Sequence, residues 1–570
     1  MTRMNWLPGG NVKLTGEIGK MLEKSIRNRL CTMDYKKLVE PFHQRYEDDG
    51  GWRGEFWGKN IRGAILSCYV TGDKELAALL KASVNDMLST QTPDGCISSY
   101  PTEKQLTGWD IWGRKYALIG LMRYYNLLEQ DPRIPVACAR SLDFLIEQLK
   151  EKKLQLKDCG RHDGLASCSI LGAVVEVYRL TQEKRFLDFA VDIVESGCSL
   201  RHNIFKEALK GTLPCDLGNG KAYEMMSCFQ GLAQLQEFIP NPRWHEVVMR
   251  FFKMVSEHEL FVTGAAGCRD RVGEFWGEGN LMQTDNNFKH TGGLGETCVT
   301  VTWLHYCNEI LRLCGDGVVP THFERTAFNA ILGGTDDTAV LWVHLNPTPL
   351  AGPTHKVPPE DQIGKCFGKP FDGHDCCRAQ GPEGLAMLPV LALMQGEGEN
   401  APWYMNLYES METPYFKMEG TYPFDGDALK IVFTKEMTHS LCLNILPDVA
   451  SVKLDGKELP IQQGTYLKVA ETFKVGQVID IRFDTAVKAE RRGNLVALTS
   501  GPLVLAQDSR IYGRAVGTPL EGCHFDFQRI APRQGFRTCF QNRDGRILCD
   551  YASADSTFQQ DVSIQVWHDC

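Results

Sequence analysis

Between about residue 12 and residue 335, the chain repeats one pattern, in which an amphipathic helix, a short polar turn and another helix follow each other. Apolar residues recur at spacings of three and four in stretches such as 116–125 and 170–178, which is helical periodicity. The Gly, Pro, Asn and Asp of the turns end one helix and start the next. The turns at 71–74, 130–133, 181–184 and 240–243 recur at about 50 to 60 residues, and a further turn lies at 314–317. This pattern predicts a series of αα-hairpins.

Helical hairpins of this period either stack into an open solenoid or close into a ring, and the repeat alone leaves both arrangements open. Three long segments rich in Gly, Pro and polar residues, at 91–110, 200–220 and 259–295, favour closure. Loops of this kind converge on a site at one end of a helical barrel. We therefore expect an α/α barrel.

From about residue 420 the period changes. Apolar and polar residues alternate in segments such as 428–433 and 478–483, between turns that contain Gly and Asp, and this predicts an antiparallel β-sandwich. The expected protein is mainly α with a β part. We expect the barrel over residues 1–418, with a few inserted strands such as 339–345, and the β-sandwich domain over 419–570.

The charge balance, 62 basic against 71 acidic residues, leaves no basic excess to neutralise phosphates, so we expect no nucleic-acid partner and no membrane partner. We find no apolar run of bilayer length and no signal peptide, which predicts a cytoplasmic protein. The 21 cysteines are then expected to be reduced and mostly buried. The sequence leaves open whether the chain forms a homo-oligomer.

Two cysteine motifs stand apart, and each precedes a helical stretch. They are Glu296-Thr297-Cys298 and the pair Cys376-Cys377. Thiolates and a carboxylate are good ligands for Zn²⁺, and these residues supply the four donors of a tetrahedral site. Two small buried residues would account for the cysteine pair equally well. From the residues alone, both interpretations stay open.

One pentapeptide, Gly-Glu-Phe-Trp-Gly, occurs twice, at 54–58 and 273–277. A carboxylate beside an aromatic ring suits a sugar site, if both copies lie in loops. Chance similarity explains a match of this length equally well.

The order of Glu296-Thr297-Cys298, the segment 324–329 and Cys376-Cys377 resembles glycoside hydrolase family 127, the β-L-arabinofuranosidase family. The resemblance covers most of the chain and includes 91–95, 178–181 and 497–504. It implies an (α/α)6 barrel catalytic domain followed by a C-terminal β-sandwich domain. It also implies a zinc ion held by Glu296, Cys298, Cys376 and Cys377.

In this family the first cysteine of the pair is the nucleophile of a retaining glycosidase, so the resemblance implies that role for Cys376. The family's acid/base glutamate corresponds best to Glu274, with Glu278 as its rival. The implied partner is a glycoside or oligosaccharide, from which the enzyme releases a terminal β-L-arabinofuranosyl or similarly shaped sugar.

The chain departs from the family around the sugar. Arg378-Ala379-Gln380 follows the cysteine pair in place of Pro-Pro-Asn, and the sugar-contacting histidines have no clear counterparts. These departures leave the sugar open. Two further functions stay open: a sugar epimerase or unsaturated-uronide hydrolase, and a non-catalytic carbohydrate-binding protein with a structural zinc.

Overall fold

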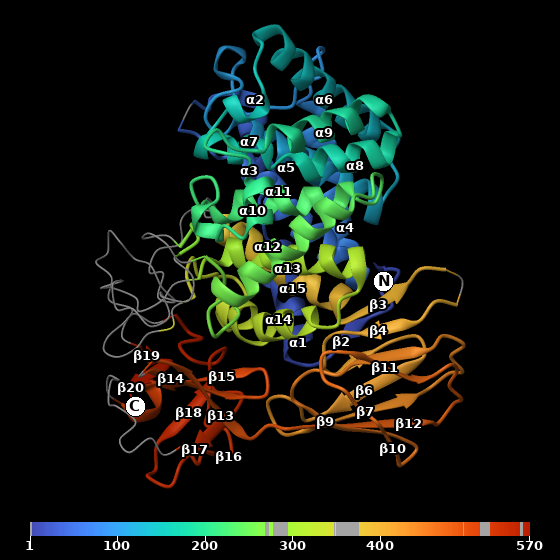
Figure 1. Cartoon of the computed structure of the whole chain (residues 1–570), viewed down its shortest axis with the longest axis vertical. Helices are drawn as coiled ribbons and strands as arrows, with labels where there is room; N and C mark the ends of the chain where they lie inside the picture. Colours follow the sequence, from blue (N-terminus) through green and yellow to red (C-terminus); the bar gives the residue numbers. More distant parts are fainter. Residues whose placement is uncertain are drawn as a thin grey trace.

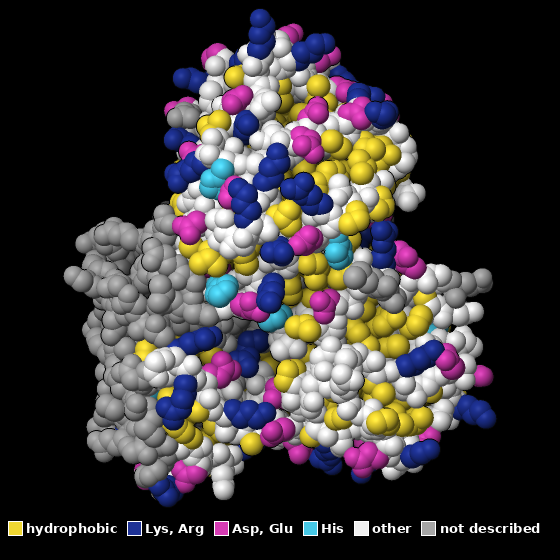
Figure 2. Space-filling model, in the orientation of Figure 1, with side chains coloured by type: hydrophobic (Ala, Val, Ile, Leu, Met, Phe, Trp, Pro, Cys, Tyr) yellow, Lys and Arg dark blue, Asp and Glu magenta, His cyan; other side chains and the backbone are white. Residues whose placement is uncertain are grey.

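The structure is a computed structural model, which describes residues 3–48, 50–267, 273–277, 295–346, 348, 376–398, 400–493, 495–513, 525–558 and 562–569. Figure 1 shows a helical body above two groups of strands, which lie side by side beneath it. The predicted fold class, a helical barrel followed by β structure, is confirmed. Figure 2 shows acidic and basic side chains interspersed over the visible face of all three parts.

Six helices form a closed inner ring, because each contacts the next and the last contacts the first. In ring order they are α3 (Gly54–Thr71), α5 (Asp110–Leu127), α8 (Leu171–Thr181), α11 (Ala222–Leu235), α13 (Thr297–Cys314) and α15 (Cys376–Ala392). Nearly all residues of α3, α13 and α15 are buried. A helix buried all round packs on one side against the ring interior and on the other against a second layer. The ring settles the choice between solenoid and barrel.

A second layer of more amphipathic helices covers the ring, and each of its members contacts an inner helix. It consists of α1 (Glu17–Ser25), α2 (Tyr35–Gln44), α4 (Lys74–Ser89), α6 (Arg133–Lys152), α9 (Lys184–Ser196), α12 (Pro242–His258) and α14 (Val319–Thr326). Shorter helices are α7 (Leu165–Cys168), α10 (Ile204–Lys210) and α16 (Ser509–Tyr512).

The predicted turns separate these helices as expected. Gly72 ends α3 in the left-handed conformation with φ 69°, and the Asp73 carboxylate then caps α4 by accepting a hydrogen bond of 2.8 Å from the Leu76 amide. Asn241 caps α12 in the same way, with Pro242 in its first turn.

One helical stretch, His162–Thr181, is apolar and long enough to span a membrane, which differs from the sequence-based expectation. Its mean hydropathy is 1.2, and 67% of it is buried inside the fold. Its main part, α8, packs between α9 and α11. Burial of this extent is typical of a core helix.

The first group of strands contains two sheets, and each sheet takes in one strand from the start of the chain. The five-stranded sheet runs β1 (Met4–Trp6), β3 (Leu393–Gly396), β4 (Trp403–Met405), β8 (Leu441–Asn444), β11 (Tyr466–Ala470). The seven-stranded sheet runs β10 (Lys457–Leu459), β9 (Val449–Leu454), β12 (Val478–Phe483), β7 (Ala428–Phe433), β6 (Phe416–Gly420), β5 (Met411–Glu412), β2 (Lys13–Leu14).

The second group is an eight-stranded sheet with a hydrophobic core of its own. Its main path runs β13 (Val487–Arg492), β14 (Leu495–Ser500), β15 (Leu503–Asp508), β18 (Ile547–Asp550), β17 (Cys539–Gln541), β16 (Gln528–Ile530). In addition, β19 (Ile564–Gln565) pairs with β15, and β20 (Trp567–Asp569) pairs with β14.

Two details bear on the expected domain organisation. The segment 339–345 is not a regular strand, because it makes only isolated bridges, such as Trp342 with Thr335 and Leu345 with Glu296. After the barrel, strands begin at Leu393, ahead of residue 419. The division of the chain into 1–418 and 419–570 stays a prediction.

Candidate metal and catalytic site

The first turns of several inner helices meet at one end of the ring. Glu55 in the first turn of α3 accepts a hydrogen bond from the Trp112 indole of α5. One turn further along α3, Lys59 Nζ lies 3.8 Å from Cys298 Sγ at the start of α13. The positive ends of the helix dipoles therefore point to the same region, which favours anionic groups there.

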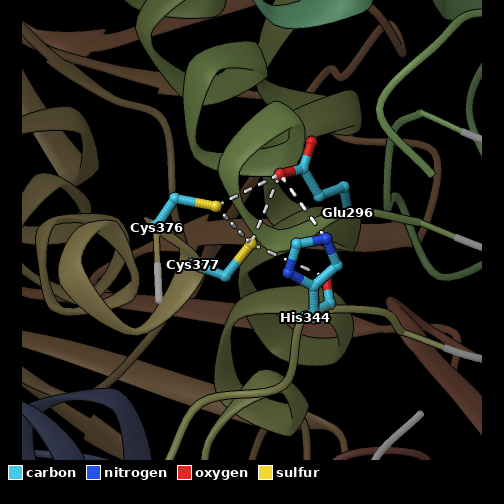
Figure 3. Close-up of side chains that lie close together, drawn as sticks. All are labelled: Glu296, His344, Cys376 and Cys377. Carbon is cyan, nitrogen blue, oxygen red and sulfur yellow. Dashed lines mark hydrogen bonds and ion pairs between the residues drawn. The ribbon is translucent and has the colours of Figure 1, made fainter. Parts of the chain in front are cut away.

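Four side chains converge at this end: Glu296, His344, Cys376 and Cys377 (Figure 3). Their ligand atoms all lie within 4.8 Å of one another. Glu296 Oε1 is 3.4 Å from Cys377 Sγ and 3.9 Å from Cys376 Sγ, and the two sulfurs are 3.9 Å apart. His344 Nε2 lies 4.0 Å from Glu296 Oε1. We call these four residues, together with Cys298, the thiol cluster.

Backbone hydrogen bonds bring Glu296 and His344 together. Glu296 precedes α13, and its amide donates to the carbonyl of Ala266. The Thr297 amide donates to the His344 carbonyl at 3.0 Å, and the Asn346 amide donates to the Gly295 carbonyl at 2.7 Å. The segment around His344 is thus held along the start of α13, while both cysteines of the pair begin α15.

Cys298 belongs to the same cluster. Its side chain is fully buried in the first turn of α13 and hydrogen-bonds with the thiols of Cys376 and Cys377. The structure therefore brings together all four residues that the sequence predicts as zinc ligands, and it adds His344.

The three thiols differ in acidity. Hydrogen bonds from Cys298 and Cys377 hold the pKa of Cys376 well below its usual range, and the charge of Lys59 lowers it further. Burial raises the pKa of the Cys298 and Cys377 thiols. Cys376 is also only partly buried, whereas the other two are fully buried. Of the three sulfurs, Cys376 combines the most thiolate character with access from outside.

The predicted acid/base residue lies close to the cluster. Glu274 accepts a hydrogen bond from Lys221 Nζ, and its backbone carbonyl accepts one of 3.0 Å from the Ala222 amide at the start of α11. The pKa of Glu296 is well above its usual range, mainly through burial, and the charges of Cys376 and Glu274 add to the effect. Glu274 is 28% exposed, so solvent or a substrate can reach it. Its rival, Glu278, lies outside the described residues.

Both copies of the repeated pentapeptide place a glutamate, Glu55 or Glu274, at this end of the barrel. The first copy is the start of α3 and not a loop. Glu55 is buried, and its pKa is raised to about 7 through that burial, with the charge of Lys59 opposing the rise and that of Cys376 adding to it. The two tryptophans, Trp57 and Trp276, are fully buried core residues and not sugar-facing walls.

Aromatic side chains of a different set lie beside Glu274. The ring of Trp109, which is half-buried, lies 5.3 Å from that of His162, and His162 lies 5.7 Å from Phe275. Such an aromatic edge next to a carboxylate suits a carbohydrate.

His344 and Lys59 were not predicted as site residues from the sequence. His344 is the single histidine in the apolar run 339–345, and histidine is a common metal ligand, so the residue type was a usable signal. Lys59 gave no signal, because a lysine in a helix is ordinarily solvated.

The comparisons with known proteins agree with the site. The sequence matches the profile of the β-L-arabinofuranosidase GH127 catalytic domain over residues 19–389. A comparison with curated proteins finds no match.

Solved structures resemble the whole chain. A GH127 β-arabinofuranosidase matches with a TM-score of 0.72 at 16% identity, covering 99% of this chain and 98% of its own. A GH127 β-L-arabinofuranosidase from Geobacillus stearothermophilus T6 matches with a TM-score of 0.72 at 14% identity, covering 98% and 100%. At these identities the likeness supports the fold, and the family follows from the profile. The chain thus belongs to glycoside hydrolase family 127, the β-L-arabinofuranosidase family, and is a glycoside hydrolase with a carbohydrate substrate.

Proposed function

We propose that the protein is an exo-acting, retaining glycoside hydrolase that releases a terminal β-L-arabinofuranosyl or similarly shaped sugar. Cys376 is its nucleophile and Glu274 its general acid and base. The observation that carries the proposal is the convergence of Glu296, Cys376 and Cys377, with ligand atoms within 4.8 Å, in a chain that matches the GH127 catalytic domain.

The donors of the thiol cluster fit a zinc ion. Thiolate sulfur, carboxylate oxygen and imidazole nitrogen are the ligands that Zn²⁺ prefers, and here they come from residues that are buried or, like Cys376, partly buried. Glu296, Cys298, Cys376 and Cys377 would hold the ion, with His344 as a fifth donor nearby. When bound, the ion would keep the thiols deprotonated at neutral pH. Lys59 and the helix N-termini would offset part of the negative charge.

The reaction has two displacement steps. In the first, Cys376 Sγ attacks the anomeric carbon, the glycosidic C–O bond breaks, and Glu274 gives its proton to the departing oxygen. In the second, Glu274 takes a proton from water, the water oxygen attacks the anomeric carbon, and the C–S bond breaks to restore the Cys376 thiolate. Two inversions at the same carbon give overall retention of configuration.

A catalytic thiolate is easily oxidised, so we place the enzyme in the reducing cytoplasm. Every cysteine within the described residues is a free thiol, which agrees with this placement.

The decisive test is a panel of aryl glycosides that covers α and β pentofuranosides, pentopyranosides and deoxysugars, assayed with and without a zinc chelator. We expect hydrolysis of aryl β-L-arabinofuranoside or a close analogue with one zinc per chain, and its loss on chelation. Cys31→Ala, a change of another partly buried free cysteine, is the matched control for Cys376→Ala. Full activity of the Cys376→Ala variant would disprove the mechanism, and tight sugar binding without any hydrolysis would favour a binding protein with a structural zinc.

A further inference from the structure

A cavity of about 390 Å³, lined by both apolar and charged side chains, lies inside the barrel, beyond the thiol cluster. Its walls come from α3, α5, α8, α11 and α13, and none of the cluster residues lines it. On α13 the cavity-lining residues run from Thr302 to Arg312. At 1.5 Å per helical residue, they lie about 6 to 21 Å beyond Cys298 along the axis. Along α3 and α13 the cavity thus lies toward the C-terminal ends, away from the cluster, while on α8 and α11 its lining begins in the first turn, at Gly172 and Tyr223.

A layer of aromatic side chains separates the cavity from the cluster. The hydroxyls of Tyr116 and Tyr223 hydrogen-bond to each other, and Arg62 donates to the Tyr223 hydroxyl at 3.2 Å. Lys59, which contacts Cys298, lies 4.9 Å from the Tyr223 ring centroid. Along α3, therefore, Glu55 and Lys59 lie on the side of the thiol cluster, and Arg62 lies at the cavity.

The inner part of the cavity carries more positive than negative charge. Arg62 and Arg123 line it, and both bind the buried carboxylate of Glu383, at 2.6 and 2.7 Å. Burial alone would raise the pKa of Glu383, but Arg62, His305 and Arg123 lower it to about 2, so Glu383 stays ionised. One carboxylate thus faces two arginines.

Lys115 adds a third basic group, and no carboxylate of the described residues lies within ion-pair distance of it. Its side chain is only 4% exposed. Its Nζ donates to the Ser169 hydroxyl at 3.2 Å and lies 4.2 Å from the Trp112 ring centroid. A buried ammonium without a carboxylate is costly, and a ligand carboxylate would relieve that cost.

The outer part of the cavity is balanced in charge and rich in hydrogen-bonding groups. Glu176 and Arg179 form an ion pair there, and Asn126 is exposed at the surface. The Trp6 indole of β1 donates to Asn308 Oδ1 at 2.8 Å. Amide, carboxylate and guanidinium groups beside an indole suit sugar hydroxyls and a sugar ring.

We propose that this cavity is a second ligand site, for a small polyhydroxylated carboxylate such as a sugar acid. The ligand carboxylate pairs with Lys115 and Arg62 at depth, and its hydroxyls meet the polar groups near the surface. The cavity volume falls within the usual range of about 300 to 1,000 Å³ for small-molecule sites. This site is independent of the glycosidase mechanism.

The test uses the zinc-loaded holoenzyme and isothermal titration calorimetry with D-galacturonate. D-galactose, which has a hydroxymethyl group in place of the carboxylate, is the matched ligand, and inorganic phosphate is a second comparator. We expect saturable binding of galacturonate with galactose at least tenfold weaker. Equal binding of galactose, or phosphate binding tighter than galacturonate, would overturn the assignment of a sugar carboxylate.

Substitutions in the cavity test whether galacturonate binds there. Lys115→Met should weaken galacturonate binding at least tenfold while zinc content stays unchanged, and Cys376→Ala should leave the affinity as in the wild type. Unchanged affinity in Lys115→Met would place the ligand elsewhere and refute the proposal. Asn126→Trp, at an exposed wall position that should tolerate substitution, is the second variant. It should also weaken binding at least tenfold, and wild-type affinity in this variant would equally refute the proposal.

Discussion

The two ends of the barrel interior differ in the sign of charge that they leave uncompensated. At the N-terminal ends of the inner helices, three thiols and Glu296 lie close together, and these groups favour the binding of a cation. In the other half, Arg62 and Arg123 share one carboxylate, Glu383, and Lys115 has no carboxylate of the described residues within ion-pair distance, so this part of the cavity favours an anion. The face of the molecule that is visible in Figure 2 shows no such separation, since acidic and basic side chains are interspersed across it. One ring of helices can thus present two chemically opposite sites, separated by a layer of tyrosines.

The largest effect is expected at Cys376. Cys376→Ala should reduce kcat/KM on an aryl β-L-arabinofuranoside by about 10⁴-fold or more, because it removes the nucleophile. Steady-state kinetics of the zinc-loaded variant measure this effect. Galacturonate binding in the other half should be unaffected, and a parallel loss of both would mean that the two ends are not independent.

The next effect is expected at the general acid. Glu274→Gln should lower kcat by about 10² to 10⁴-fold on substrates with poor leaving groups, and much less on activated aryl glycosides that need no protonation. A series of aryl leaving groups of rising pKa measures the difference. A rate that does not change with Glu274→Gln would move the role to Glu278.

A smaller effect is expected at Lys59, which lies between Cys298 and the ring of Tyr223. Lys59→Met should weaken zinc affinity by about 10 to 100-fold, because Lys59 lies 3.8 Å from Cys298 Sγ and offsets its charge. Competition with a chromogenic chelator measures the affinity. Lys157→Met, on the short helix at 156–158 near the surface, is the control and should leave zinc affinity unchanged. An unchanged affinity in Lys59→Met would show that the helix N-termini suffice.

The smallest effect concerns pH in the cationic half. Burial, with a further contribution from the charge of Arg62, lowers the pKa of Lys115 to about 7. Lys115 is therefore protonated below about pH 7 and neutral above it, so an anionic ligand should bind more tightly at low pH. We expect galacturonate affinity to fall by about tenfold between pH 6 and pH 8.

The surroundings of Lys115 support the assignment of that pH dependence. The charged or titratable groups that act on Lys115 are Arg62 and Lys59 of α3 and Glu224 and Cys228 of α11. Arginine stays protonated throughout the range, and the pKa of Lys59 is well above its usual value. Lys115→Arg, which keeps the charge at all pH values, should abolish the pH dependence. If the dependence persists, another group is responsible.

Local sequence signals predicted the helices and their turns, and they marked out much of the cluster. Gly72, Asp73 and Asn241 specify turns through backbone conformation and capping, which depend on neighbours in the chain. Glu296 and Cys298 stood out as one short motif before a helical stretch, but their role as metal ligands was implied by the family resemblance, because the residues alone left the zinc interpretation open.

The features of the fold and the site that were not predicted depend on contacts between segments that lie far apart in the sequence. His344 reaches Glu296 through bridging hydrogen bonds that no periodicity encodes, and Glu55 looked like a loop residue although it begins a buried helix. Closure of the ring was predicted, because the long loops at 91–110, 200–220 and 259–295 favour a barrel. The cationic cavity and the pairing of β1 and β2 with strands about 390 to 400 residues away were not predicted, because they depend on contacts between distant segments. A pattern that reports on local structure cannot predict them.

The pairing of β1 with β3 also constrains how the protein can be made. Met4 pairs with Gly396, and α15 must contact α3 before the ring is complete. As the ribosome releases the chain from the N-terminus, the first hairpins can form early, but their ring stays open until residues beyond 392 have emerged. During that interval the inner faces of the helices are exposed, so the nascent chain is expected to need chaperone protection until the barrel closes. Contacts of such large sequence separation should also make refolding slow.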